Sequence, residues 1–292
     1  MVSYGVKLCK GGTDLNLNWL QSALYGLLSG LTDILPVSAQ AHKVLMLKFF
    51  GIRTNMELMD LMIHLSIFAA LYFSSQSQLV RFSRARALAR IPKRKRKRPL
   101  DVRSLMDLSM LKTMLVPVVI GLFLYQYALE LKNNLMLLSV FLFLNGIVIY
   151  VPQFLPGSNR DSRTLSRVEG LLMGLGGAAS VLPGVSAIGM VTSIGSVCGV
   201  ERSYSLNMAL LMNLFLTLGL IVYDVLAIVA SGLGVLSFLI FIRYLLTALI
   251  AFGGSMLGIK LMRHLAANHG NTVFAFYSIG LALFTFILNL MT

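Results

Sequence analysis

Residues 30–42 read GLTDILPVSAQAH, and residues 177–189 read GAASVLPGVSAIG. In both stretches a glycine precedes the proline by six residues, and a serine follows the proline within three. Pro36 and Pro183 are 147 residues apart, about half of the chain. Apolar segments interrupted by Gly and Pro at corresponding positions of two halves indicate an internal repeat built on paired broken helices.

The composition places this repeat in a membrane. The 292 residues are 57% hydrophobic and 12% charged, with a mean hydropathy of +0.81, which leaves too little polar surface for a soluble domain. Two isolated cysteines, Cys9 and Cys198, give neither a disulfide framework nor a zinc motif. We expect six crossings, each near the ~20 residues that span the hydrocarbon, at 58–79, 110–130, 135–155, 205–230, 236–261 and 272–292.

The remaining apolar segments are predicted to form two re-entrant helical hairpins, at 17–50 and 169–200. Irregular backbone at membrane depth is stable only where it lines an enclosed or aqueous cavity, because lipid cannot satisfy its N–H and C=O groups. The expected fold is a single all-α integral membrane domain over residues 1–292, with about six transmembrane helices and two hairpins. Its halves, 15–155 and 168–292, would form an inverted repeat around a polar cavity.

Positive charge is concentrated in one segment of the chain. Eleven of the 25 basic residues lie between 81 and 103, which we interpret as a loop. Between apolar spans, such a loop indicates a cytoplasmic position and contact with anionic lipids. The formal net charge of +14 therefore does not indicate a nucleic-acid partner. Basic residues in 157–167 and 260–264 then fall on the same side, and both chain termini fall outside.

Asp33 is the strongest candidate for a functional residue. A carboxylate inside a membrane segment costs about 2.5–3.5 kcal/mol on insertion scales, so it is expected to face a cavity or a partner. The alternative is that Asp33 caps the next helix or pairs with Lys43. His42 is a candidate general acid or base, against a packing role through hydrogen bonds. Ser38 and Ser186 lie beside the paired prolines, where hydroxyls and backbone N–H groups at helix N-termini can bind phosphate oxygens.

Other polar residues are weaker candidates. His64 lies within the predicted span 58–79, and Asp224 is expected to mark a helix end. Arg202 follows the second hairpin and is a candidate anion contact. A small-residue face for close helix packing is predicted at Gly253, Gly254 and Gly258. The sequence has no zinc-protease, nucleotide-binding or esterase motif in a suitable context.

With GLTDILPVSAQAH and LPGVSAIG, the chain resembles the bacitracin-resistance type of undecaprenyl pyrophosphate phosphatase. That family has GLTEFLPVSSTGH in its first half and PG(T/F)SRSG in its second. The stretches MDLMIHLSIFAALYF, GVERSYSLNMALL and FAFYSIGLALF also resemble family segments in the same order, so the likeness covers nearly the whole chain. It implies a protein of the bacterial plasma membrane that removes one phosphate from undecaprenyl pyrophosphate, the polyprenyl lipid carrier of peptidoglycan synthesis.

The resemblance also implies a cofactor and a set of site residues. The family uses acidic residues, a divalent cation (Mg²⁺ or Ca²⁺) and an arginine on the diphosphate. Carried over position by position, it implies catalytic Asp33, Ser38 and His42, with Asp33 also as the metal ligand, and substrate-binding Ser29, Gly184, Ser186 and Arg202.

The chain departs from the family at several motif positions. A second family glutamate falls at Ser29, the arginine of SRSG at Ala187, and the glutamate of AAAEFS at Asn207. Loss of a cationic clamp on the transition state can cost orders of magnitude in rate, and one carboxylate seldom holds a hard divalent cation alone. Three hypotheses stay open: a divergent phosphatase in which Arg202 replaces the lost arginine, a transporter of polyprenyl phosphate between leaflets, and a non-catalytic partner of envelope enzymes. A homodimer is a further expectation.

Overall fold

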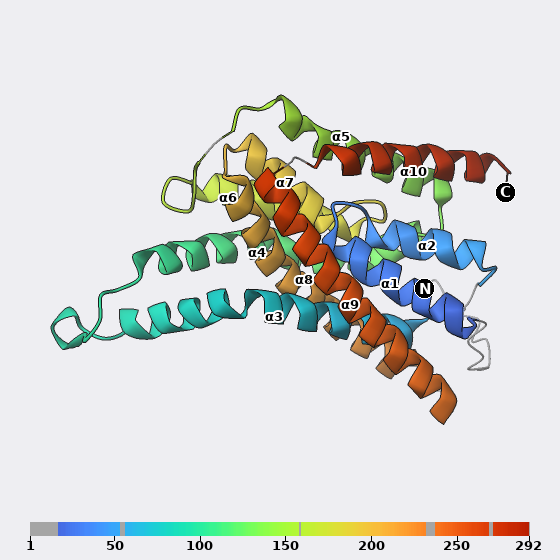
Figure 1. Ribbon diagram of the computed structural model, residues 1–292, viewed down its shortest axis with the longest axis horizontal. Helices are drawn as coiled ribbons and strands as arrows, with labels where there is room; N and C mark the ends of the chain where they lie inside the picture. Colours follow the sequence, from blue (N-terminus) through green and yellow to red (C-terminus); the bar gives the residue numbers. More distant parts are fainter. Residues whose placement is uncertain (1–16, 53–55, 158, 232–236, 269–270, 292) are drawn as a thin grey trace, which may run out of the picture.

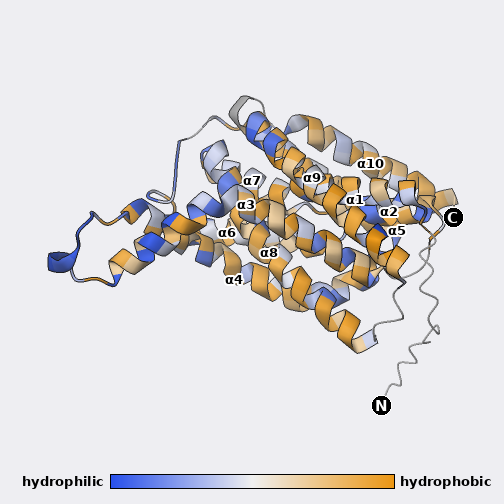
Figure 2. Cartoon of the chain, turned by 60° about the horizontal axis from the view of Figure 1, so that its bottom comes forward, coloured by the Kyte–Doolittle hydropathy of each residue, from blue (hydrophilic) through white to orange (hydrophobic). Residues whose placement is uncertain are grey.

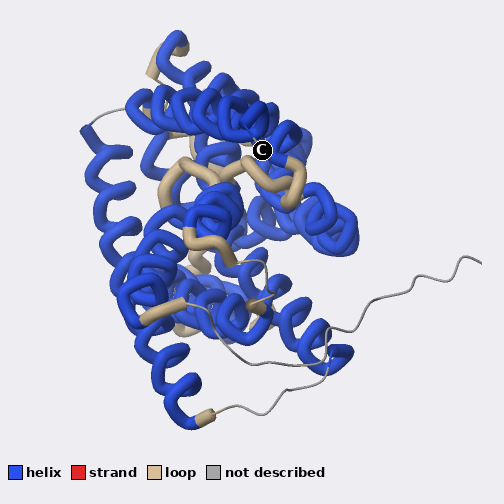
Figure 3. Tube along the Cα trace, turned by 90° about the vertical axis from the view of Figure 1, so that its right-hand side faces the viewer, coloured by secondary structure: helices blue, strands red, loops and turns tan. Residues whose placement is uncertain are grey.

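The computed structural model describes residues 17–52, 56–157, 159–231, 237–268 and 271–291, and every regular element in these ranges is a helix (Figure 3). Cys9 and the first residues of the predicted first half lie outside these ranges. The α-helices are α1 (Trp19–Ile34), α2 (Ala39–Phe49), α3 (Glu57–Ala89), α4 (Val102–Leu131), α5 (Leu135–Tyr150), α6 (Arg167–Ala178), α7 (Ala187–Val197), α8 (Arg202–Ser231), α9 (Phe238–Asn268) and α10 (Thr272–Met291). Short 3₁₀ turns are η1 (Lys93–Lys95), η2 (Val151–Phe154) and η3 (Ala179–Val181).

Six of the described helices are long and apolar enough to cross a membrane: α3, α4, α5 with η2, α8, α9 and α10. The all-α integral membrane class and the six predicted crossings are therefore confirmed. Large apolar side chains such as Phe123, Phe143 and Leu249 are exposed on these helices, and the apolar colouring covers most of the helical body (Figure 2). Exposed apolar faces of this kind are suited to lipid contact.

The basic segment differs from its prediction as a loop over 81–103. Helix α3 continues to Ala89 and α4 begins at Val102, so only residues 90–101 connect them. The stretch RFSRARALA at 81–89 remains helical because Arg, Ala and Leu are good helix formers even where they are exposed. The ends of α3 and α4 with their connection protrude as a hydrophilic arm beyond the apolar body (Figures 1 and 2). Its cytoplasmic position stays a prediction.

The first proline motif separates α1 from α2. Helix α1 begins at a capping box, in which Asn18 Oδ1 accepts from the Gln21 N–H and Gln21 Oε1 accepts from the Asn18 N–H. It ends at Ile34, because Leu35 takes the extended conformation that a following proline requires. The Ser38 side chain then accepts from the Ala41 N–H and caps α2. Pro36 therefore converts one apolar run into two helices.

The second proline motif repeats this local pattern between α6 and α7. Helix α6 also begins at a capping box, made by Ser166 and Glu169. Leu182 is extended before Pro183, Gly184 follows at φ +108°, which favours glycine, and the Ser186 side chain caps α7 by accepting from the Gly189 N–H. The two broken-helix pairs, α1–α2 and α6–α7, are thus built alike, while their re-entrant and inverted placement in a bilayer stays a prediction.

Glycines bring each pair close to a long helix. A Cβ added at Gly30 on α1 would lie 2.1 Å from the Ala251 carbonyl oxygen on α9, and one at Gly174 on α6 would lie 2.3 Å from the Met114 carbonyl oxygen on α4. Gly254 and Gly258 of the predicted small-residue face also contact α1, whereas Gly253 faces open space. Close backbone approach therefore fixes α1 and α6 against α9 and α4.

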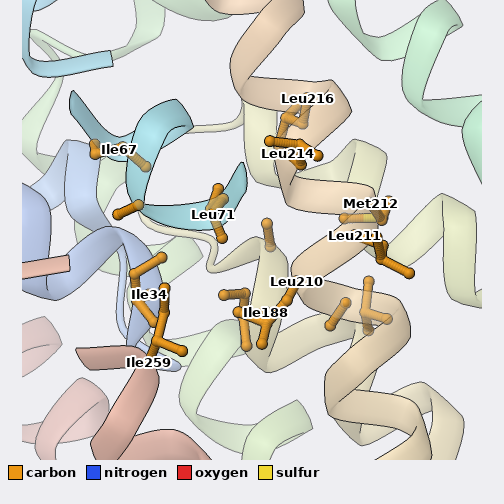
Figure 4. Packing of buried hydrophobic residues seen from close by; sticks show 14 of the residues in the cluster. Ile34, Ile67, Leu71, Ile188, Leu210, Leu211, Met212, Leu214, Leu216 and Ile259 are labelled. Atoms are coloured by element: carbon orange, nitrogen blue, oxygen red, sulfur yellow. The ribbon is translucent and has the colours of Figure 1, made fainter. Parts of the chain in front are cut away.

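The main apolar core lies where these elements meet (Figure 4). It includes Ile34 at the end of α1, Ile188 at the start of α7 and Ile67 on α3, all essentially inaccessible to solvent. Leu210 and Leu211 on α8 join the same cluster. Because the core contacts the helices on both sides of each proline turn, it provides rigid support for the polar groups at those turns.

Candidate functional site

The two proline turns contact each other in the interior. The Gly184 N–H donates to Ser38 Oγ at 3.0 Å, and the Ser186 hydroxyl donates to the Leu35 carbonyl at 3.1 Å. All four residues are buried. Two stretches separated by half of the chain are therefore joined by two hydrogen bonds, both donated by the second turn and accepted by the first. The helix ends at these turns face a common space.

This space is a polar cavity of about 540 Å³. Its lining includes the first residues of α3 and the last residues of α4, so it lies toward the end of the molecule opposite the connection 90–101. Helices α1, α2, α7 and α8 complete its wall. The polar side chains of the lining include Tyr25, Ser29, Asp33, Gln40, Lys43, Asp60, His64, Tyr125, Ser180, Ser186, Asn213, Tyr223 and Asp224.

Asp33 lines the cavity in the last turn of α1. Its Oδ2 accepts a hydrogen bond of 2.9 Å from the Asn213 amide on α8. It neither caps α2, which is the role of Ser38, nor pairs with Lys43 in the structure. Ser29 lies one turn earlier and also lines the cavity, and its buried hydroxyl has no hydrogen-bond partner in the described part of the chain. Asp33 and Ser29 thus present acceptor and donor groups side by side.

Ser186 is the predicted site residue that the second pair contributes to the same wall. Its N–H donates to Asn145 Oδ1 on α5 at 2.9 Å, and the Asn145 amide in turn donates to the Ser278 hydroxyl on α10 at 3.4 Å. The start of α7 is therefore oriented by a buried polar chain that reaches two further helices. Ala187, at the position of the family arginine, also lines the cavity.

Three other predicted site residues are placed behind the wall. Ser38 and Gly184 form the contact between the turns and are not among the cavity-lining residues. His42 is buried on the opposite face of α2, where Nδ1 donates to the Ser38 carbonyl at 2.6 Å and Nε2 lies 2.7 Å from the Tyr277 hydroxyl on α10. Because both ring nitrogens are engaged, the structure places His42 as a link between α2 and α10.

Arg202 is not brought together with Asp33. It lines a second, smaller cavity of about 150 Å³, with Thr192 of α7 and Asn271 near the start of α10. This cavity lies at the same end of the molecule as the hydrophilic arm. Its lining also includes Pro152, in the turn η2 after α5, and Met262, in the last turns of α9. The structure does not place Arg202 as a clamp in the larger cavity.

The larger cavity contains one ion pair and one carboxylate–imidazole pair that the sequence interpretation did not select. Lys43 Nζ lies 2.8 Å from Asp60 Oδ1, which also accepts from the Tyr25 hydroxyl at 3.3 Å. His64 Nδ1 lies 2.6 Å from Asp224 Oδ2, and each side chain is 9% exposed. The expectation that Asp224 marks a helix end is wrong, because α8 continues to Ser231. The sequence signal that could have identified these pairs is the presence of ionisable residues inside apolar spans.

The protein groups alone do not complete a divalent-cation site. In the described ranges no three His, Cys, Asp or Glu side chains come together in a metal-binding arrangement. Three acidic side chains of the cavity already have partners in the protein. Asp33 is hydrogen-bonded to Asn213, Asp60 is paired with Lys43, and Asp224 is hydrogen-bonded to His64. The described residues therefore do not by themselves fit Mg²⁺ or Ca²⁺, and dependence on either cation stays a prediction.

Fold and site together define a class: an all-α integral membrane protein in which two broken-helix pairs meet at a polar cavity between the spans. The family model described as Bacitracin resistance protein BacA matches residues 22–284, and the chain belongs to that family. An undecaprenyl-diphosphatase of Methanobrevibacter smithii is 25% identical over 263 residues, covering 88% of this chain and 93% of the relative. One from Renibacterium salmoninarum is 26% identical over 273 residues, covering 93% and 96%.

Proposed function

We propose that the protein is a polyprenyl-diphosphate phosphatase that removes one phosphate from undecaprenyl pyrophosphate in the larger cavity. The single observation that carries the proposal is that both motif turns meet and deliver Ser29, Asp33 and Ser186 to one cavity. Family membership and the names of the relatives support the substrate class.

The cavity has the chemistry that a lipid diphosphate head requires. The Ser29 hydroxyl and the first turn of α7, which Ser186 caps, supply hydrogen-bond donors for phosphate oxygens. Lys43, 14% exposed, supplies a cation within the same wall. Apolar helix faces around the site are suited to the polyprenyl chain, while the head is held in a polar space from which lipid is excluded.

Phosphate release from undecaprenyl pyrophosphate by the purified protein, measured with Mg²⁺, with Ca²⁺ and with chelator, tests this proposal. We expect release by the wild-type protein and at least a hundredfold lower rate for Asp33→Ala. Glu201→Ala is the matched control, because Glu201 is an exposed acid outside the cavity. No release with any cation, or equal loss in both variants, would refute the proposal.

Transport of polyprenyl phosphate is a second candidate, favoured by the second cavity. Helix α7 lines both cavities, through Ser186 and Ala187 at one end and Thr192 and Ser196 toward the other. A helix shared by cavities at opposite ends suits alternating access in a protein with paired broken helices. Movement of labelled polyprenyl phosphate across proteoliposome leaflets tests this candidate, and movement equal to that in protein-free liposomes would rule it out.

A further inference from the structure

The cavity contains an imidazole that is placed differently from His42. His64 belongs to α3, lines the cavity, and is 7% exposed. Its Nδ1 is bonded to Asp224 of α8 at 2.6 Å, which is a short, charge-assisted contact. In the part of the chain that the structure describes, His64 makes no second side-chain hydrogen bond. One ring nitrogen is thus fixed by a carboxylate, and the other is left for a ligand.

The contact with Asp224 determines the tautomer of His64. A carboxylate only accepts hydrogen bonds, so the proton of a neutral imidazole is on Nδ1 and the lone pair is on Nε2. Carboxylate–imidazole pairs of this kind orient a general base and stabilise the imidazolium that forms when it takes a proton. His42 lacks this arrangement, because its Nδ1 donates to a carbonyl and its Nε2 is engaged by Tyr277.

We propose that His64 is the general base of the phosphatase reaction and that Asp224 is its positioning residue. This inference rests on the proposed function. Nε2 of His64 takes a proton from a water whose oxygen forms a bond to the terminal phosphorus of the diphosphate. The bond from that phosphorus to the bridging oxygen breaks, its electron pair stays on that oxygen, and polyprenyl phosphate and inorganic phosphate result. The imidazolium, stabilised by Asp224, then returns its proton to water in the cavity.

Other titratable groups face the same space and contribute to its pH dependence. They come from five helices and one connection: Tyr25 and Asp33 of α1, Lys43 and Lys48 of α2, Glu57 and Asp60 of α3, Tyr125 and Glu130 of α4, Tyr223 and Asp224 of α8, and Lys132 after α4. Of these, only Asp224 is hydrogen-bonded to His64 in the described structure. A variant at His64 therefore tests the base itself, and one at Asp224 tests the orientation of that base.

The experiment compares His64→Gln and Asp224→Asn with the matched control His264→Gln, whose parent residue is exposed on α9 outside both cavities. Phosphate release is measured from pH 5 to pH 9, and binding of undecaprenyl phosphate is measured separately on the same purified samples. We expect His64→Gln to lower the rate by about 10²–10⁴-fold, to abolish the acidic limb of the pH profile, and to keep binding within about threefold.

The binding measurement also confirms that each variant is folded. Asp224→Asn is expected to lower the rate at least tenfold, and Asp224→Glu to restore part of it, because the carboxylate is then kept. Wild-type rates in His64→Gln would overturn the inference and leave the proposed function standing. Equal losses of rate and binding would also overturn it, since His64 would then hold the head group. A wild-type protein that binds undecaprenyl phosphate but releases no phosphate would overturn both.

Discussion

Replacement of Gly30 by alanine tests how strictly the cavity depends on close helix packing. The new Cβ would lie 2.1 Å from the Ala251 carbonyl oxygen and 2.9 Å from its Cα, whereas ordinary contact begins at 3.4 Å. Because the obstacle is backbone, α1 and α9 must separate by about 1.3 Å to restore ordinary contact. Such overpacking costs about 1–3 kcal/mol, against a gain of roughly 1 kcal/mol from the better helix propensity of alanine.

The expected result is a net loss of stability and a larger loss of function. Ser29 and Asp33 lie on the displaced helix, and a shift near 1 Å at a catalytic group can cost about a hundredfold in rate. Thermal unfolding in detergent and phosphate release are measured for Gly30→Ala beside Gly253→Ala. A Cβ at Gly253 meets nothing within 4 Å, so that control should be as stable as the wild type or slightly more stable. Equal stability and activity in both variants would refute the packing argument.

Four further outcomes follow from the site. Asn213→Leu removes the donor to Asp33, which should cost about 1–3 kcal/mol and lower phosphate release; unchanged unfolding and rate would contradict this. Lys43→Met should weaken binding of undecaprenyl phosphate at least tenfold, while Arg202→Met, in the other cavity, should leave binding unchanged. Weaker binding in Arg202→Met but not in Lys43→Met would instead support Arg202 as the cation that binds the head group. Tyr277→Phe removes the partner of His42 and should lower the unfolding temperature, while the rate of phosphate release stays within about threefold. A lower rate with an unchanged unfolding temperature would support a catalytic role for His42. Neutralising Lys93–Lys95 should reduce copurifying anionic lipid without changing the rate, and equal lipid content would count against that contact.

The breaks in the two broken-helix pairs were predictable because their causes are local. A proline disfavours helix at the preceding residue wherever it occurs, so Leu35 and Leu182 end their helices in the same way. The serine caps after each proline are equally local. The six crossings were predictable because length and hydropathy alone decide whether a helix can span hydrocarbon.

The partners of the charged residues were not predictable from local pattern. His64 and Asp224 are 160 residues apart in sequence, and their contact depends on how α3 is rotated against α8. Asp224 is a single charge between two apolar stretches and therefore resembled a helix boundary, although it is buried and lines the cavity. His42 illustrates the same limit, because helix rotation alone decides whether its ring faces the cavity or α10.

The positions of the cations show how, under the proposed function, a chain with alanine at the motif arginine would bind a phosphorylated head. Ala187 leaves space in the cavity wall, and Lys43 enters the same wall from α2 with its ammonium group already on Asp60. A phosphate oxygen that approaches Lys43 exchanges one anionic partner for another, so the ammonium group is never left buried without a counter-ion. Arg202 offers no such exchange, because its guanidinium lines the cavity at the arm end. Under the proposed function, electrostatic clamping would therefore come from Lys43, on the helix that follows the first motif turn, and not from the second motif turn.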